Sequence, residues 1–295
     1  MDEYFKKEIV ISKDTKLVFV TGLPVNLFFH VLNIYGVLRR HGETYKERKN
    51  DNTDPKLEKT LYTLGFDLAV AKLVACDPKT PEILFETFNS NEVENILTLA
   101  LKQSWRQFYK NYWEQNWERL LAVFISNIET QDWVGIAKRM EILSDSKFES
   151  NFFLVGAEAL AESAICVEPN ISIGSVRSNY DVGFFHEGMH LLLNEKWANE
   201  PRIKSLVLEN WNEIGGWGKN WKGKIEQVVV VSLDSMNRDM KQERRHDYFV
   251  GNNVGDLEEP FFEPLKTWYL EKIKGRSDKA IADVIFSILS KMGRF

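Results

Sequence analysis

One stretch near the N-terminus limits what this chain can fold into more than any other. From Leu17 to Leu38 the sequence contains no Lys, Arg, Asp or Glu, so these residues must lie in a protein core or in a lipid bilayer. Gly22 and Pro24 interrupt the stretch, and both favour a turn over a continuous membrane helix. The sequence therefore predicts a buried strand over residues 16–21, a Gly-Leu-Pro turn and a helix that begins near Val25.

The composition of the whole chain is that of a folded globular protein. Its 295 residues are 44% apolar and 27% charged, which excludes a disordered chain and allows one large domain or two modest ones. The net charge of −5 leaves no basic excess for binding nucleic acid. Cys76 and Cys166 are too few for a disulfide framework, and the first 16 residues are too mixed in charge for a secretory signal. We therefore expect a cytoplasmic protein with no nucleic-acid partner and no membrane span.

The pattern of residue types changes along the chain and indicates two regions. The charged segment 39–59 predicts a solvated linker, and apolar residues recur at helical spacing over residues 60–145. Further on, the branched residues of ISIGSV (171–176) predict a strand. The predicted domains are a helical region with short N-terminal strands, residues 1–150, and a metal-site region, residues 151–295.

Aromatic side chains recur at helical spacing in two parts of the chain. Between Trp105 and Trp117 they follow one another in steps of one, three or four residues, which keeps them on one broad helix face and is typical of a helix-packing surface. Two more amphipathic helices are predicted over residues 260–272 and 278–292. Trp268 and its aromatic neighbours in the first of these helices are interpreted as packing residues, with a wall of a substrate cleft as the alternative.

A five-residue motif in the second region carries the clearest chemical signal. Residues 186–190 read His-Glu-Gly-Met-His, an H-E-x-x-H motif whose histidines would project from one face of a helix and could bind the same Zn²⁺. Glu187 lies beside them and could act as general acid/base on the metal-bound water, whose pKa zinc lowers from near 16 to about 7. The alternative is a buried helix on which His186, Glu187 and His190 satisfy one another, because their neighbours are apolar.

A third protein ligand is needed to complete such a site. Position 196 is Lys196, so the extended motif with a third His six residues after His190 is absent. A more distant carboxylate is therefore expected, which would leave one open position on the metal. Glu226 is favoured because it stands alone beside four valines, where a carboxylate needs compensation. Glu209 is the alternative third ligand, and Glu213 is a further candidate.

The motif and a distant Glu resemble the gluzincin group of zinc metallopeptidases. The segments HEGMHLLLN (186–194) and WKGKIEQVVVVS (221–232) are most similar to a set of uncharacterised bacterial domains with an HExxHxxxN pattern. Asn194 and Glu226 match the Asn and the Glu of that pattern. The resemblance covers residues 180–235 and implies a zincin-like core, with an active-site helix and a small sheet that has an edge strand.

This chain departs from the gluzincin pattern after the third ligand. Many gluzincins carry an Asp four residues after the ligand Glu, and counting from Glu226 that position is Val230. Counting from Glu209, the position is Glu213, an acidic residue. This comparison is the best argument for the alternative ligand.

Hydrolysis of a peptide bond implies two further elements. The tetrahedral intermediate carries an oxyanion that needs a donor besides the metal, and RRHDYF offers Arg245, His246 and Tyr248, of which His246 and Tyr248 are favoured. A surface histidine in a charged loop is the alternative for His246. An extended peptide is also held by main-chain bonds at an edge strand, for which residues 171–176 are the candidate.

The sequence thus predicts an α+β, predominantly helical protein that hydrolyses peptide bonds in a peptide or protein substrate with Zn²⁺. In this hypothesis, His186, His190 and Glu226 hold the metal and Glu187 is the general acid/base. Two other functions stay open. One is a catalytically inactive binding or regulatory protein with the same fold, and the other is a zinc hydrolase that does not act on peptides.

Overall fold

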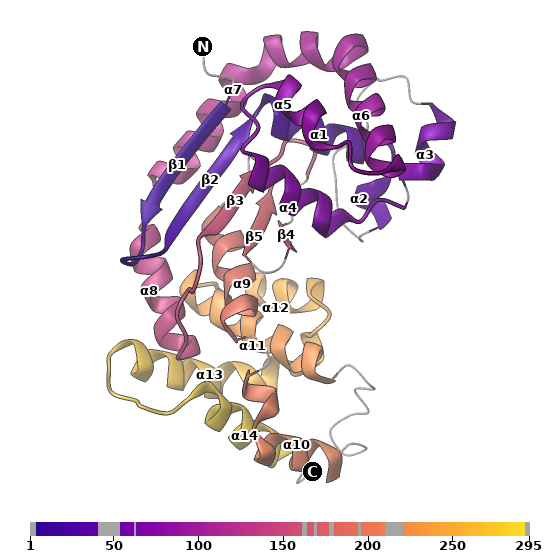
Figure 1. Cartoon of the computed structure of the whole chain (residues 1–295). Helices are drawn as coiled ribbons and strands as arrows, with labels where there is room; N and C mark the ends of the chain where they lie inside the picture. The colour runs from indigo at the N-terminus through magenta and orange to yellow at the C-terminus, as the bar shows by residue number, and fades with distance from the viewer. Residues whose placement is uncertain are drawn as a thin grey trace. The chain divides into compact units, whose positions relative to one another are not determined.

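The chain folds as an α+β protein in which most residues lie in helices, as the sequence predicts (Figure 1). It is a computed structural model that describes residues 4–40, 54–61, 63–160, 164–167, 170–176, 180–193, 196–209 and 221–292. Most of the predicted linker 39–59 lies outside these ranges, as does Asn194. No helix in the described part of the chain is long and apolar enough to cross a membrane.

The structure divides into two compact units, and each unit takes two segments of the chain. The first unit contains Met1–Trp133 and Glu149–Glu187, and the second contains Val134–Phe148 and Gly188–Phe295. The sequence indicates contiguous halves that meet at residue 150. The structural units interleave because three strands from the second half of the chain hydrogen-bond to the sheet begun by the N-terminal strands.

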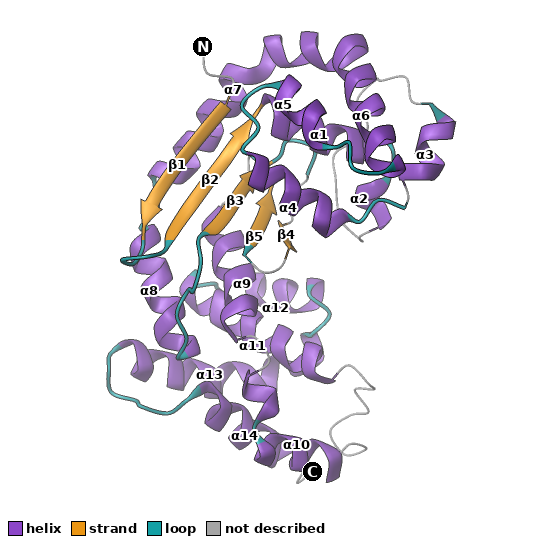
Figure 2. Cartoon of the chain, viewed as in Figure 1, coloured by secondary structure: helices purple, strands orange, loops and turns teal. Residues whose placement is uncertain are grey.

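The first unit is built on a five-stranded mixed sheet, drawn in orange in Figure 2. The strands lie in the order β1-β2-β3-β5-β4, in which β2, β3 and β5 are parallel while β1 and β4 are antiparallel to their neighbours. Strand β2 is buried on both faces, as the uncharged stretch predicts. The strands are β1 (Tyr4–Val10), β2 (Lys16–Gly22), β3 (Phe152–Gly156), β4 (Ala164–Val167) and β5 (Ile171–Gly174).

The prediction that residues 171–176 form the edge strand is wrong. These residues contain β5, which pairs with β3 on one side and with β4 on the other. All four residues of β5 are buried, as is typical of an interior strand. Among the described residues β4 pairs with β5 alone, so β4 is the edge strand on this side of the sheet.

The predicted strand and buried helix are both present, but the helix begins at Leu23, two residues before the predicted start, so that Leu23 and Pro24 belong to the helix and not to a turn. Gly22 makes the turn with a φ of 148°, a conformation that side chains rarely allow, and Pro24 occupies the first helical turn, where a missing N–H costs little. His30 in this helix is buried and stacks on Phe108. The helices of this unit are α1 (Leu23–Ile34), α2 (Val37–Arg40), α3 (Pro55–Leu61), α4 (Phe66–Cys76), α5 (Pro81–Thr87), α6 (Glu92–Ser104), a π-helical turn (Trp105–Tyr109) and α7 (Lys110–Glu129).

Helix α9 (Tyr180–Leu193) follows β5 and is shared by the two units, which divide between Glu187 and Gly188. In the first unit, Phe184 of this helix is fully buried. The ring centroid of Phe184 lies 5.2 Å from that of Phe152 on β3 and 6.0 Å from that of Trp133. These aromatic contacts hold the first half of α9 against the sheet.

The second unit is helical in its described part. Helix α11 supplies much of its core, because Ile225 and every residue from Val228 to Ser235 are buried. The two amphipathic helices predicted near the C-terminus are present. After the last turns of α9, the elements are a 3-10 turn (Lys196–Asn199), α10 (Pro201–Glu209), α11 (Trp221–Asn237), α12 (Gln242–Gly251), a second 3-10 turn (Gly255–Leu257), α13 (Glu258–Ile273) and α14 (Ile281–Met292), and α8 (Trp133–Ser144) joins them from earlier in the chain.

Candidate metal centre

The H-E-x-x-H motif lies in the second half of α9. His186, Glu187 and His190 are each partly exposed, whereas Phe185 and Met189 between them are fully buried. The spacing of four residues places both imidazoles on one side of the helix, about one turn apart. The apolar side chains therefore anchor the helix, and the polar face is left accessible.

The side chains of His190 and Glu226 are in direct contact. The Nδ1 atom of His190 lies 2.7 Å from Oε1 of Glu226, although 36 residues separate them in the sequence. Both side chains are mostly buried, with 23% of His190 and 15% of Glu226 exposed. Glu226 lies near the start of α11, where its neighbour Ile225 is fully buried. The structure thus brings the favoured third ligand to the second histidine of the motif.

The other two candidates for the third ligand cannot be compared in this way. Glu209 ends α10, but its side chain lies outside the described residues, and so does the whole of Glu213.

The contact between His190 and Glu226 is compatible with two roles for the carboxylate. Two ligands of one tetrahedral zinc each lie about 2.0–2.2 Å from the ion and so roughly 3.3–3.6 Å from each other, which means that Nδ1 and Oε1 would have to move apart to bind the same ion. Alternatively, a histidine that binds metal through one ring nitrogen often donates its other ring N–H to a carboxylate, which orients the ring. In either role Glu226 belongs to the same site as His190.

The described residues include side chains of the types that bind zinc. However, three such side chains do not lie around one point. No group of three or more His, Cys, Asp or Glu side chains in the described part of the chain is close enough to hold an ion. His190 and Glu226 nevertheless supply an imidazole and a carboxylate within one coordination shell of each other, and these are ordinary zinc ligands. His186 lies one turn earlier on the same helix. These residues fit a zinc ion better than a harder cation such as Mg²⁺, which prefers oxygen ligands throughout.

The two predicted oxyanion donors contact other partners. His246 on α12 is 63% exposed, and its Nδ1 atom lies 2.9 Å from Oε2 of Glu258. The hydroxyl of Tyr248 donates to Oδ2 of Asp234 over 2.7 Å. Asp234 follows Glu226 by eight residues on α11, which is about 12 Å along the helix axis. These contacts do not support an oxyanion role for either side chain, and that role stays a prediction.

Asp234 is a polar residue of the second unit that the sequence analysis passed over. It is fully buried and accepts hydrogen bonds from Tyr248 and from Nη2 of Arg238, the latter over 2.8 Å. The argument that singled out Glu226, a carboxylate beside a run of valines, applies equally to Asp234. The pattern could therefore have found this residue, although not its partners.

Glu258 is held ionised by two basic neighbours. Burial alone would raise the pKa of its carboxyl, but hydrogen bonds from Arg245 and His246 outweigh burial and lower that pKa. Oε1 of Glu258 accepts from Nε of Arg245 over 2.7 Å, and both side chains are largely buried. The pair fixes the start of α13 to α12.

We expect Glu258→Gln to lower the free energy of unfolding by about 1–2 kcal/mol at pH 7, because Arg245 loses a charged partner. A carboxyl whose pKa is lowered in the folded state stabilises the fold above its unfolded pKa, and that contribution is lost as the pH falls through the folded-state pKa. The difference between wild type and variant should therefore shrink toward zero below about pH 4. Urea unfolding at several pH values measures it. Glu259→Gln is the exposed control, and a difference independent of pH would contradict the assignment.

No family model matches this chain, and no curated protein or solved structure shows significant similarity to it.

Proposed function

We propose that this protein is a zinc-dependent hydrolase that cleaves peptide bonds. The observation that carries the proposal is the 2.7 Å contact between His190 of the H-E-x-x-H motif and Glu226 of α11. A metal centre with two histidines on one helix requires a further ligand from elsewhere in the chain, and Glu226 comes from a separate helix. His186, His190 and Glu226 would hold the ion.

The remaining motif residue supplies proton transfer in this proposal. Bound zinc would act as a Lewis acid and lower the pKa of a coordinated water. Glu187 lies next to His186 on α9 and is partly exposed, so its carboxylate can accept a proton from the attacking water. The same carboxyl group can then donate that proton to the amine nitrogen that leaves. A retired site would have no use for this base.

A peptide is favoured as the substrate because of the edge of the sheet. Among the described residues β4 pairs only with β5, and this leaves one side of its backbone available for hydrogen bonding. An extended peptide can add to such an edge as a further strand. Strand β4 belongs to the same unit as His186 and Glu187 of the motif.

Zinc content and its link to activity test this function. We expect close to one zinc per chain after gentle purification, and hydrolysis of a mixture of fluorescence-quenched peptides that stops with 1,10-phenanthroline and returns with added Zn²⁺. Elemental analysis and a fluorescence assay measure the two quantities. Fewer than about 0.2 zinc per chain, or hydrolysis that the chelator does not affect, would overturn the proposal.

A further inference from the structure

The second unit contains a pocket that lies apart from the H-E-x-x-H motif in the sequence. Its volume is about 560 Å³, within the range of small-ligand sites, and it is open to solvent. Helices α13 and α14 form its walls, and Arg202 of α10 also lines it. Trp268, Val284 and Ile288 supply the apolar part of the lining.

The two acidic side chains that line this pocket are already paired. Oε1 of Glu271 accepts from Nη2 of Arg276 over 2.8 Å, and Oδ1 of Asp283 accepts from Nη2 of Arg202 over 2.9 Å. The hydrogen bond from Arg202 is the main reason that the pKa of Asp283 is lowered. Both carboxylates are therefore paired with the pocket's own arginines, and Arg202 also donates through Nε to Oε1 of Glu200 over 2.7 Å.

Two lysines of the lining provide positive charge in excess of these pairs. Lys279 and Lys291 both line the pocket, and neither forms an ion pair with any residue that the structure describes. The lining therefore has four basic and two acidic side chains, although the whole chain has a net charge of −5. Glu200 shares Arg202 with Asp283, and when it is included the basic side chains still outnumber the acidic ones by four to three.

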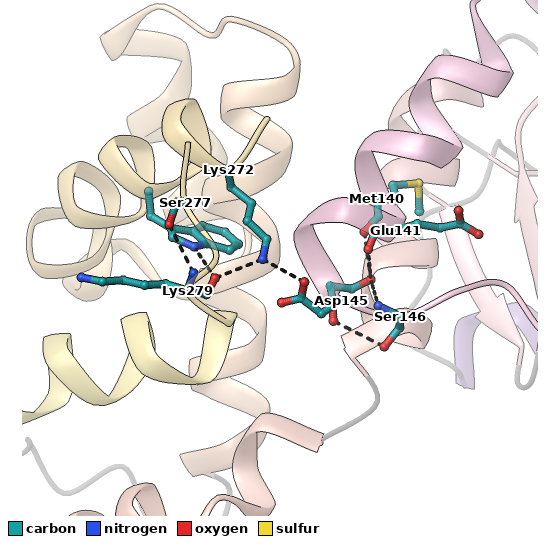
Figure 3. A network of polar contacts seen from close by, with 9 residues as sticks. Met140, Glu141, Asp145, Ser146, Lys272, Ser277 and Lys279 are labelled. Carbon is teal, nitrogen blue, oxygen red and sulfur yellow. Dashed lines mark hydrogen bonds and ion pairs between the residues drawn. The ribbon is translucent and has the colours of Figure 1, made fainter. Parts of the chain in front are cut away.

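Two buried side chains hold the backbone that carries Lys279 in place, and Figure 3 shows the contact made by one of them, Lys272. The carbonyl oxygen of Lys279 accepts from Nε1 of Trp268 over 3.0 Å and from Nζ of Lys272 over 3.2 Å. Lys272 is 8% exposed, and its Nζ also bonds to Oδ1 of Asp145 over 2.8 Å. This network fixes the loop between α13 and α14 and so presents Lys279 at a defined place on the rim.

The spacing of the two lysines defines the shape of a suitable ligand. Lys279 precedes the first turn of α14 and Lys291 lies in its last turn, so their backbones are roughly 15 Å or more apart along the helix. Val284 and Ile288 lie between them. We propose that this pocket binds a short acidic peptide segment, with a carboxylate at each end and apolar residues between. About five extended residues span such a distance.

Fluorescence anisotropy with the full-length protein tests this proposal. The probe is a dye-labelled pentapeptide, Glu-Leu-Phe-Leu-Glu, with blocked ends, and its matched control is Gln-Leu-Phe-Leu-Gln. We expect the acidic peptide to bind at least about fivefold more tightly than the neutral one. Lys279→Ala/Lys291→Ala should remove that preference, whereas Lys274→Ala, an exposed lysine on the same loop outside the pocket, should change affinity less than about twofold.

Three outcomes would overturn the proposal. The first is equal binding of the acidic and neutral peptides. The second is an effect of Lys274→Ala as large as that of the double variant, which would indicate attraction to general surface charge. The third is displacement of the peptide by suberate at the peptide's own affinity, which would assign the site to a small dicarboxylate. Because the assay measures binding alone, its failure does not bear on the proposed hydrolysis.

Discussion

Replacement of Glu187 by Gln is expected to abolish peptide hydrolysis while zinc stays bound. Gln keeps the size and hydrogen-bonding shape of Glu but cannot accept the proton of the attacking water. General acid/base groups contribute about 10²–10⁴-fold to the rate, so kcat/KM should fall by about 100-fold or more. Zinc content by elemental analysis and the rate on a fluorescence-quenched peptide give the two readouts on the same preparation.

The control for this experiment is the same substitution at an exposed site. Glu243 lies in the first turn of α12 and is exposed, so Glu243→Gln should leave both zinc content and rate unchanged. A Glu187→Gln variant that retains wild-type activity would rule out the catalytic role. A variant that loses both zinc and activity would indicate that Glu187 acts on the metal site itself and not on the proton.

Removal of Glu226 is expected to weaken zinc binding strongly, and the size of the effect distinguishes its two roles. If Glu226 is a direct ligand, Glu226→Ala should weaken zinc affinity by more than about 100-fold, because only two protein ligands remain. If Glu226 orients His190 through Nδ1, the loss should be about 10–100-fold. Competition with a fluorescent zinc chelator measures both ranges, and circular dichroism checks that the variant folds.

Glu209→Ala is the matched comparison, because Glu209 is the alternative third ligand in the sequence. We expect this variant to bind zinc as the wild type does. The opposite pattern, with zinc lost in Glu209→Ala and retained in Glu226→Ala, would move the third ligand to α10 and would leave the contact between His190 and Glu226 as a structural one.

Much of the local structure could be predicted from residue patterns. The uncharged stretch indicated β2 and α1, because only a covered strand and a buried helix accommodate so many apolar residues. The C-terminal helices followed from their apolar spacing. The interior position of β5 could not be predicted in this way, because an edge strand and a central strand with apolar side chains have similar sequences. Its neighbours come from distant parts of the chain.

The sequence by itself determined the part of the proposed site whose residues lie close together in the chain. Two histidines and a glutamate within five residues share a helix, since helical geometry depends on near neighbours. Only the tertiary structure decided which carboxylate meets His190 and which cations gather around the pocket between α13 and α14. His190 and Glu226 are 36 positions apart and Arg202 and Asp283 are 81 apart, so packing of the whole core selects these pairs. No periodicity in the sequence encodes which helix faces which.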